Sequence, residues 1–256
     1  MRWMLLALIL VGCSGKRTKP VVDPTPSWAT KSGRVEAKIE LAEALLLNGT
    51  PEASLQMISQ MVEAGVRHPD LFVLQGRALT AMGLVEEAEI ALSMATRRAP
   101  GHAEAQNRLG ILYMDQQRTD EAIKRFRMAA RAASKDAEVH NNYGFALLAA
   151  GRHEEAVEVL RTALMLDGSR DRTRNNLGFA LAVTGRDKAA WRVLRSSANE
   201  GNARYNLALA QEVRGDNDSA LASYKLAIEA DPDLDAANEA VARLTAPDVD
   251  SPKEEP

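Results

Sequence analysis

Small residues recur along this chain at a fixed spacing, with polar and larger apolar residues between them. Two series of small residues share one period, and a third series of turn residues lies between the two. Each series advances by 34 residues four times and then by 30. Three series with one period predict an array of repeated units, each with two helices and a turn. The series are Ala42, Gly76, Gly110, Gly144, Gly178 and Ala208; Ser54, Ala88, Ala122, Ala156, Ala190 and Ala220; and Gly49, Gly83, Gln117, Gly151, Gly185 and Gly215.

The spacing has a direct physical interpretation. A small residue in the first helix lets the second helix approach closely, and an alanine in the second helix packs against the first. Glycine at the turn adopts a positive φ at low cost and ends the first helix. Each pair exposes an apolar face that only its neighbour covers, so the array is stable collectively.

Other positions carry the residues of a known repeat. They include Leu109-Gly110, Tyr113, Ala122, Phe126 and Ala129 in one unit, and Tyr224, Ala227 and Pro232 in the last. The chain resembles the tetratricopeptide repeat (TPR) family, which implies an all-α, right-handed superhelix (an α-solenoid) of about six helix-turn-helix repeats plus a C-terminal capping helix. We expect the solenoid over 35–246, with repeats at 35–68, 69–102, 103–136, 137–170, 171–200 and 201–234 and the cap at 235–246. The predicted repeat-packing residues are Gly76, Ala88, Gly110, Ala122, Gly144, Ala156, Gly178, Ala190 and Ala220.

Two units depart from the pattern. In the first unit, Ser54, Met61 and Val66 replace the usual Ala, Ala and Pro, as in a terminal repeat. The fifth unit lacks four residues near Ser196–Gly201, which predicts a second helix about one turn shorter and a local change of pitch. This irregularity is either evolutionary drift, which we favour, or a local pocket.

The N-terminus has the features of a targeting signal. Arg2 precedes nine apolar residues, Trp3 to Val11, a run too short to span a membrane but typical of a secretory signal. Leu10-Val11-Gly12-Cys13 resembles the lipobox of bacterial lipoproteins, which implies removal of residues 1–12 and acylation of Cys13. The alternative is an ordinary signal peptide that leaves Cys13 as a free thiol. Several acyl chains would hold the protein on a membrane.

The segments at the two ends of the solenoid differ from it in composition. Residues 13–34 contain three prolines and no apolar period, which predicts a flexible tether behind the lipidated cysteine. Ser14 follows Cys13 where lipoproteins retained on the inner membrane carry Asp. The resemblance therefore implies the outer membrane, on its periplasmic side, or the cell membrane of an organism with one membrane. Residues 247–256 are predicted to be a disordered acidic tail.

Composition argues against several functions. With 32 basic and 35 acidic residues, the net charge of −3 does not favour nucleic acid as a partner. One cysteine allows neither an intrachain disulfide nor a cysteine-based zinc cluster. His68 and His102 lie at turns and are a weak metal signal. Since no catalytic motif occurs, we expect no enzyme activity, no metal, no small-molecule substrate and no cofactor beyond the lipid on Cys13.

A protein-binding groove is expected where first helices line the inner surface of such a superhelix. Two first-helix positions four residues apart share a face and recur in each unit. The predicted groove residues are Asn107, Asn141, Phe145, Asn175, Phe179 and Tyr205. Asparagine pairs with a peptide amide of any sequence, and phenylalanine contacts apolar side chains. The phenylalanines have an equal claim to the core, and we expect the next series, Asn142, Asn176 and Asn206, to bond to neighbouring helices.

Longer sequence segments point to a kind of lipoprotein. Asn141-Asn142-Tyr143-Gly144 with Gly151-Arg152 resembles the type IV pilus biogenesis lipoproteins of the PilF/PilW/Tgl type, which are secretin pilotins. The segment from Arg174 to Leu181, with the truncated fifth unit, is more similar to TadD of the Tad/Flp pilus system. Either resemblance implies a non-enzymatic adaptor for pilus assembly whose partners are a secretin or another assembly subunit. The alternative is a scaffold or regulator for cell-envelope or peptidoglycan enzymes.

Overall fold

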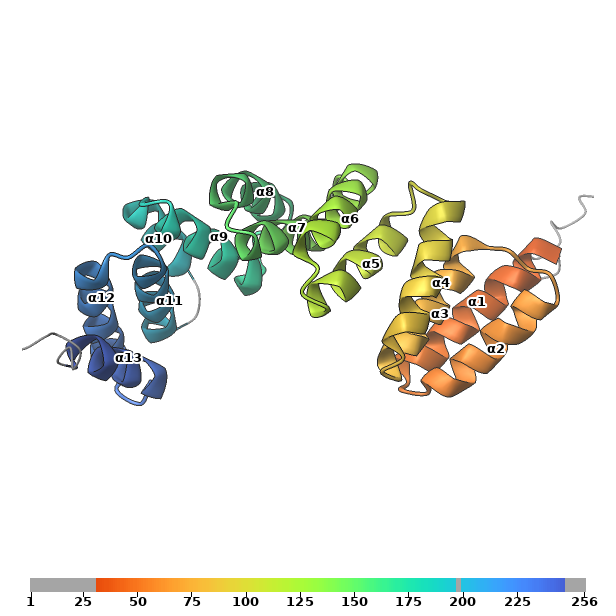
Figure 1. The fold of residues 1–256 in the computed structure, drawn as a ribbon, viewed down its shortest axis with the longest axis horizontal. Helices are drawn as coiled ribbons and strands as arrows, with labels where there is room; N and C mark the ends of the chain where they lie inside the picture. Colours follow the sequence, from red (N-terminus) through yellow and green to blue (C-terminus); the bar gives the residue numbers. More distant parts are fainter. Residues whose placement is uncertain (1–30, 197–198, 247–256) are drawn as a thin grey trace, which may run out of the picture.

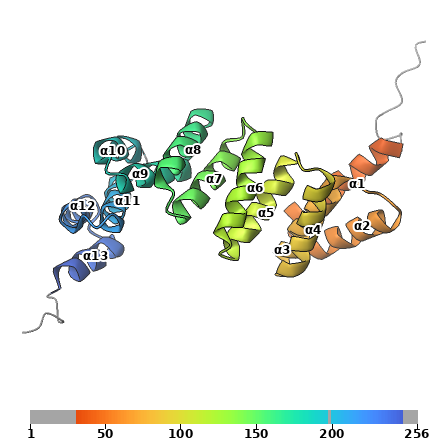
Figure 2. The same cartoon turned by 45° about the horizontal axis from the view of Figure 1, so that its top comes forward.

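The computed structural model describes residues 31–196 and 199–246, which form thirteen α-helices and no strand. Consecutive helices pack as antiparallel pairs that follow one another along the long axis, and contacts join mainly neighbouring helices (Figures 1 and 2). The predicted all-α solenoid is therefore confirmed. The helices are α1 Lys31–Leu47, α2 Pro51–Glu63, α3 Pro69–Ala81, α4 Val85–Arg98, α5 Ala103–Asp115, α6 Thr119–Ala132, α7 Ala137–Ala149, α8 His153–Leu166, α9 Asp171–Val183, α10 Asp187–Leu194, α11 Glu200–Val213, α12 Asn217–Ala230 and α13 Asp235–Thr245.

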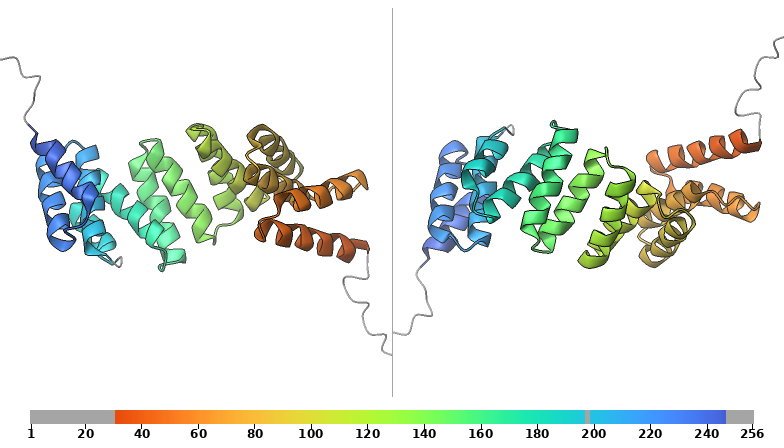
Figure 3. Two further views of the ribbon diagram at one scale, coloured as in Figure 1. Left: turned by 90° about the horizontal axis from the view of Figure 1, so that it is seen from below. Right: turned by 90° about the horizontal axis from the view of Figure 1, so that it is seen from above.

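The two helices of each pair have different positions in the stack. In the middle of the array, α5, α7 and α9 lie on the inner side of a shallow arch, while α6, α8 and α10 lie on its outer side (Figure 1). Views along the perpendicular direction show the same hairpins stacked in chain order from one end to the other (Figure 3). The first helices therefore form one continuous surface and the second helices form another.

Small residues allow the close approach within each pair. A Cβ atom added to Gly144 of α7 would lie 2.4 Å from Cγ of Leu160 on α8. The added Cβ would meet Leu92 at Gly76 and Leu194 at Gly178 in the same way. On the second helices, the series Ala88, Ala122, Ala156, Ala190 and Ala220 is fully buried. The period seen in the sequence is thus the period of helix-to-helix contact.

The turns inside the pairs use the left-handed backbone conformation that the sequence predicts. Gly49, Gly83, Gly151, Gly185 and Gly215 have φ between 71° and 86°. In the third unit the same position is Gln117, with φ of 61°, and it alone among the described non-glycine residues has positive φ. Glutamine has a Cβ atom, so it is strained in this conformation.

Replacing Gln117 by glycine should therefore stabilise the protein by about 1 kcal/mol, since the left-handed conformation costs a non-glycine residue roughly that much. The added backbone freedom of glycine in the unfolded state offsets part of the gain. The measurement is the urea midpoint of the helical circular dichroism signal. Asp115→Gly, at the last residue of α5, should instead lower that midpoint, and a lower midpoint for Gln117→Gly would contradict the prediction.

The fifth unit is shortened as the sequence predicts. Its second helix, α10, has 8 residues, whereas α4, α6, α8 and α12 have 14 each. Of the two helices of the fifth unit, α11 packs more against the first helix, α9, than against the short α10. In the units before it, the first helix packs more against the second helix of the preceding unit than against that unit's first helix. The stacking therefore changes between the fifth and sixth units.

The boundary of the predicted tether needs one correction. We expected the tether to extend to residue 34, but α1 begins at Lys31, and Gly33 is already buried. No proline lies between Pro26 and Pro51, so nothing prevents the helix from starting before residue 35. The predicted signal peptide, Cys13 and the acidic tail lie outside the described residues. Within 31–196 and 199–246, none of the helices combines the length and apolar character that crossing a membrane requires.

Candidate functional site

The inner surface of the array contains an open hollow of about 480 Å³ between α7, α9 and α11. Its walls are mainly apolar and carry several side-chain amides. Phe145 at its edge is 50% exposed, so it belongs to the surface and not to the core. The lining residues are Phe145, Leu148, Ala149, Asn175, Asn176, Phe179 and Asn206. We call this hollow the inner groove.

Three of the six predicted groove residues line the inner groove. Phe145 and Asn175 lie there as expected, and Phe179 lies there with part of its ring packed against the core. The sequence left open whether the two phenylalanines face the groove or the core. In the structure Phe145 is half exposed and lines the groove, whereas Phe179 lines the groove and also packs against the core.

Asn107 and Asn141 do not face the groove, which corrects the prediction for these two residues. They are only 8% and 5% exposed, and each accepts a hydrogen bond from the next unit. Asn142 Nδ2 donates to Asn107 Oδ1 at 3.2 Å, and Asn176 Nδ2 donates to Asn141 Oδ1 at 3.0 Å. The first residue of each bonded pair is buried by the following helix, so its amide is not available to a peptide.

The bonded asparagines join α5 to α7 and α7 to α9. This agrees with the expectation that Asn142 and Asn176 bond to a neighbouring helix. Asn176 also lines the inner groove, as does Asn206. The polar lining of the groove therefore comes partly from the series for which we had predicted a structural role. In α9 both Asn175 and Asn176 line the groove, and Asn176 bonds to Asn141 as well, so the two series do not divide into one groove series and one structural series.

Tyr205 also needs a correction. Its ring packs against Tyr224 of α12, with the ring centroids 5.5 Å apart, and it is not among the residues that line the inner groove. Tyr205 belongs to the apolar cluster of the last unit. The short α10 changes how α11 packs, so the position that is Asn in the preceding units does not keep its orientation here.

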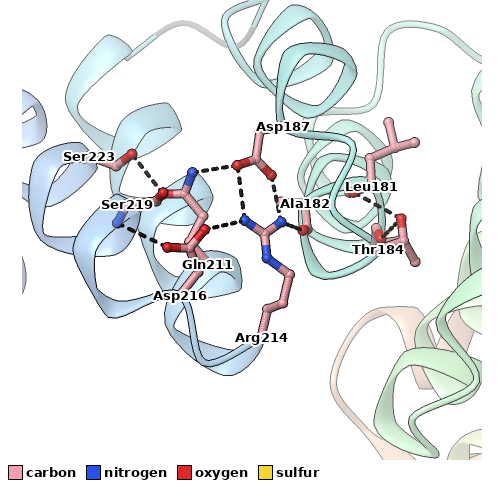
Figure 4. Close-up of polar contacts among 10 residues, drawn as sticks. Leu181, Ala182, Thr184, Asp187, Gln211, Arg214, Asp216, Ser219 and Ser223 are labelled. Carbon is pink, nitrogen blue, oxygen red and sulfur yellow. Dashed lines mark hydrogen bonds and ion pairs between the residues drawn. The ribbon is translucent and has the colours of Figure 1, made fainter.

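A group of polar side chains holds α11 in place beside α9 (Figure 4). Arg214, which directly follows α11, donates to Asp187 Oδ1 at 2.8 Å and to Asp216 Oδ2 at 2.8 Å, and it also donates to the carbonyl of Ala182 at the end of α9. Gln211 donates to Asp187 Oδ2 at 2.8 Å and accepts from Ser223. The Arg214 guanidinium lowers the pKa of the Asp187 carboxyl, which keeps the pair ionised. These bonds attach the C-terminal end of α11 to the end of α9 and the start of α10.

The polar cluster around Arg214 and Asp187 could not be predicted from the sequence. Arg214 lies at a turn, and Asp187 lies at the start of a second helix, where an acidic residue is expected in any case. The only signal was the truncated fifth unit, which we attributed to drift. The structure shows that the shortened unit is stabilised by specific polar contacts.

Toward the N-terminus the inner surface becomes more charged. A smaller hollow of about 290 Å³ between α3 and α5 contains Arg77 and Arg108. Arg77 Nη1 lies 2.7 Å from Glu43 Oε1 of α1 and 3.5 Å from Glu104 Oε1 of α5. The guanidinium is already paired, so this half of the surface is a network of charges between units. The apolar groove is confined to the other half.

The two turn histidines have structural roles. His68 and His102 are the N-caps of α3 and α5. The backbone N–H of Ala105 donates to His102 Nδ1 at 3.1 Å, and Nε2 lies 2.6 Å from Asp70 Oδ1. His102 therefore caps α5 and joins it to α3 of the preceding unit. No group of three potential metal ligands occurs in the part of the chain that the structure describes.

Fold and groove together define a helical-repeat array with an open, mainly apolar hollow on its inner helices. The tetratricopeptide repeat model matches residues 73–137, 107–175 and 187–235. The chain therefore belongs to the tetratricopeptide repeat family, whose members mediate protein–protein interactions and are typically not catalysts. No curated protein matches the sequence.

Solved structures with the same fold include two kinds of TPR protein. MamA (residues 41 to the end) from Desulfovibrio magneticus RS-1 is 20% identical; the match covers 63% of this chain and 91% of MamA, with a TM-score of 0.56. YrrB, a TPR protein with an unusual peptide-binding site, is 20% identical; the match covers 72% of this chain and 96% of YrrB, with a TM-score of 0.61. At these identities the likeness shows the fold alone.

Proposed function

We propose that this protein is a lipid-anchored adaptor that holds a segment of another protein in its inner groove. The observation that carries the proposal is the exposed, mainly apolar hollow around Phe145, with amides of Asn175, Asn176 and Asn206 beside it. An extended peptide needs both features, since its backbone requires hydrogen-bond partners and its side chains require apolar contacts. YrrB is an example of a TPR protein with a peptide-binding site.

The sequence supports a more specific proposal about place and partner. The lipobox-like Leu10-Val11-Gly12-Cys13 and the serine after it favour acylation of Cys13 and attachment to the periplasmic face of the outer membrane. The resemblance to TadD and to the PilF/PilW/Tgl lipoproteins favours a secretin or another pilus-assembly subunit as partner. In this proposal the protein needs no cofactor besides its covalent lipid and transforms no substrate.

Replacing Cys13 by alanine should abolish acylation and release the protein from the outer-membrane fraction, because the anchor of several acyl chains is lost. The measurement is the distribution of the protein between separated membranes and periplasm, with metabolic labelling by a radioactive fatty acid. Ser14→Ala, which keeps the cysteine, is the control and should leave acylation and membrane attachment in place. Unchanged fractionation and labelling of Cys13→Ala would overturn the lipoprotein proposal.

Deletion of the gene separates the proposed function from the alternative. Loss of pili and of assembled secretin with normal cell shape would support a role in pilus assembly. Altered cell shape with intact pili would instead support a scaffold for cell-envelope enzymes. Quantification of secretin multimers in unheated envelope samples gives the direct readout.

A further inference from the structure

A second groove lies on the outer side of the arch, between α6 and α8. Its volume is about 320 Å³, and it shares no lining residue with the inner groove, although α7 contributes side chains to both. Side chains from α6, α7 and α8 line it. They include Arg127, Arg131, His140, Tyr143, Glu158 and Val159. We call this hollow the outer groove.

Two arginines give the outer groove its charge. Arg127 and Arg131 lie one turn apart on α6, so both side chains occupy the same face of that helix, and both are exposed. Neither takes part in an ion pair within residues 31–196 and 199–246. His140 lines the groove too, with Nε2 3.2 Å from the carbonyl oxygen of Ser134. The groove therefore presents two guanidinium groups to solvent.

The carboxylates that could neutralise these arginines are engaged elsewhere. Arg152 donates two hydrogen bonds of 2.7 Å to the carboxylate of Glu155 and thereby lowers its pKa. Glu158 lies 3.2 Å from Arg161 on its own helix. Arg127 is close enough to Glu155 to help lower the pKa of that carboxyl, but neither groove arginine forms an ion pair with a carboxylate among the described residues. A protein with a net charge of −3 nevertheless has a locally basic groove here.

We propose that the outer groove binds an acidic segment of a partner protein that carries two carboxylates at alternate positions, as in Glu-x-Glu. Residues one turn apart on a helix have Cβ atoms about 6 Å apart, and alternate residues of an extended chain lie roughly 6.6 Å apart. Two neighbouring guanidinium groups therefore have about the same spacing as two such carboxylates. Each guanidinium can bind one carboxylate through two parallel hydrogen bonds. Tyr143 and Val159 supply an apolar floor for the residue between them.

A peptide fits this site better than a lipid surface. The arginines border a hollow between α6 and α8 in which Tyr143 of α7 is only partly exposed. A planar layer of headgroups would reach the rim but not the floor. The proposal is independent of the inner groove, because none of the residues that line one hollow lines the other.

The test uses the full-length chain in detergent and fluorescent peptides in which Glu-Gly-Glu is compared with Gln-Gly-Gln. The wild-type protein should bind the acidic peptide, and Arg127→Gln with Arg131→Gln should weaken that binding by about tenfold or more, since hydrogen bonds between charged groups are lost. Both side chains are exposed, so the thermal midpoint should not change. Lys124→Gln with Arg97→Gln removes the same charge outside the groove and should change binding by less than about twofold.

Four results would overturn the proposal. Equal loss of binding in the control pair would show a diffuse charge effect, and equal binding of the Gln peptide would show that carboxylates are not recognised. Binding to vesicles of phosphatidylglycerol that depends on Arg127 and Arg131, without binding of the acidic peptide, would assign the surface to lipid. Phe145→Ala should leave acidic-peptide binding intact, and a loss there would place the peptide in the inner groove.

Discussion

Gly144→Leu should destabilise the protein by about 2–3 kcal/mol and loosen the pair formed by α7 and α8. Leucine is a better helix former than glycine, which alone would stabilise α7 by about 1 kcal/mol. The loss therefore comes from packing, because a Cβ atom at Gly144 already lies 2.4 Å from Cγ of the fully buried Leu160. Overpacking of this kind typically costs 1–3 kcal/mol and sometimes more. Since each pair is covered only by its neighbours, the damage should spread to adjacent units.

The measurement is equilibrium urea unfolding followed by circular dichroism, with limited proteolysis to locate the loosened pair. Ala132→Leu, an exposed substitution on α6, is the matched control and should stay within about 0.5 kcal/mol of wild type. Adding Leu160→Ala to Gly144→Leu should recover part of the loss, because it restores the total volume between the helices. Wild-type stability of Gly144→Leu would contradict the close approach of these two helices.

Phe145→Ala should lower the affinity for the proposed peptide partner by about 30-fold. Aromatic residues at the centre of a binding surface typically contribute 2 kcal/mol or more, which corresponds to roughly that change in dissociation constant. The ring is 50% exposed in the free protein, so its removal should cost little stability. The measurement is titration with the partner segment, once that segment is identified by mass spectrometry of proteins co-purified from solubilised envelopes.

The control for this experiment removes apolar side chains elsewhere that are at least as exposed as Phe145. Met165 of α8 and Ile90 of α4 are 79% and 61% exposed and do not line the inner groove. Their replacement by alanine should leave partner binding unchanged. If Phe145→Ala binds as tightly as wild type while the control pair loses affinity, the outer surface and not the inner groove holds the partner.

The groove could be predicted from the sequence only in part. The period of 34 residues identified the helices whose surface forms it, and the four-residue spacing correctly paired Asn175 with Phe179 on one face. Asn141 and Asn142 are adjacent in the chain, and sequence alone does not show which of them the next unit covers. The hydrogen bonds between units decide this, because burial of Asn141 depends on where α9 packs.

The sequence by itself determined the repeat, the packing residues and the turns. The same close helix-to-helix contact is made in every unit, so it requires a small residue at the same position each time, as at Gly110 and Gly144. The tertiary structure alone decided the arrangement around α10, where Arg214 bonds to Asp187 of α10 and to the carbonyl of Ala182 in α9, and the placement of the two exposed arginines in the outer groove. These features occur only once, so no repeated spacing in the sequence indicates them. They depend on the relative placement of helices that are distant in the chain.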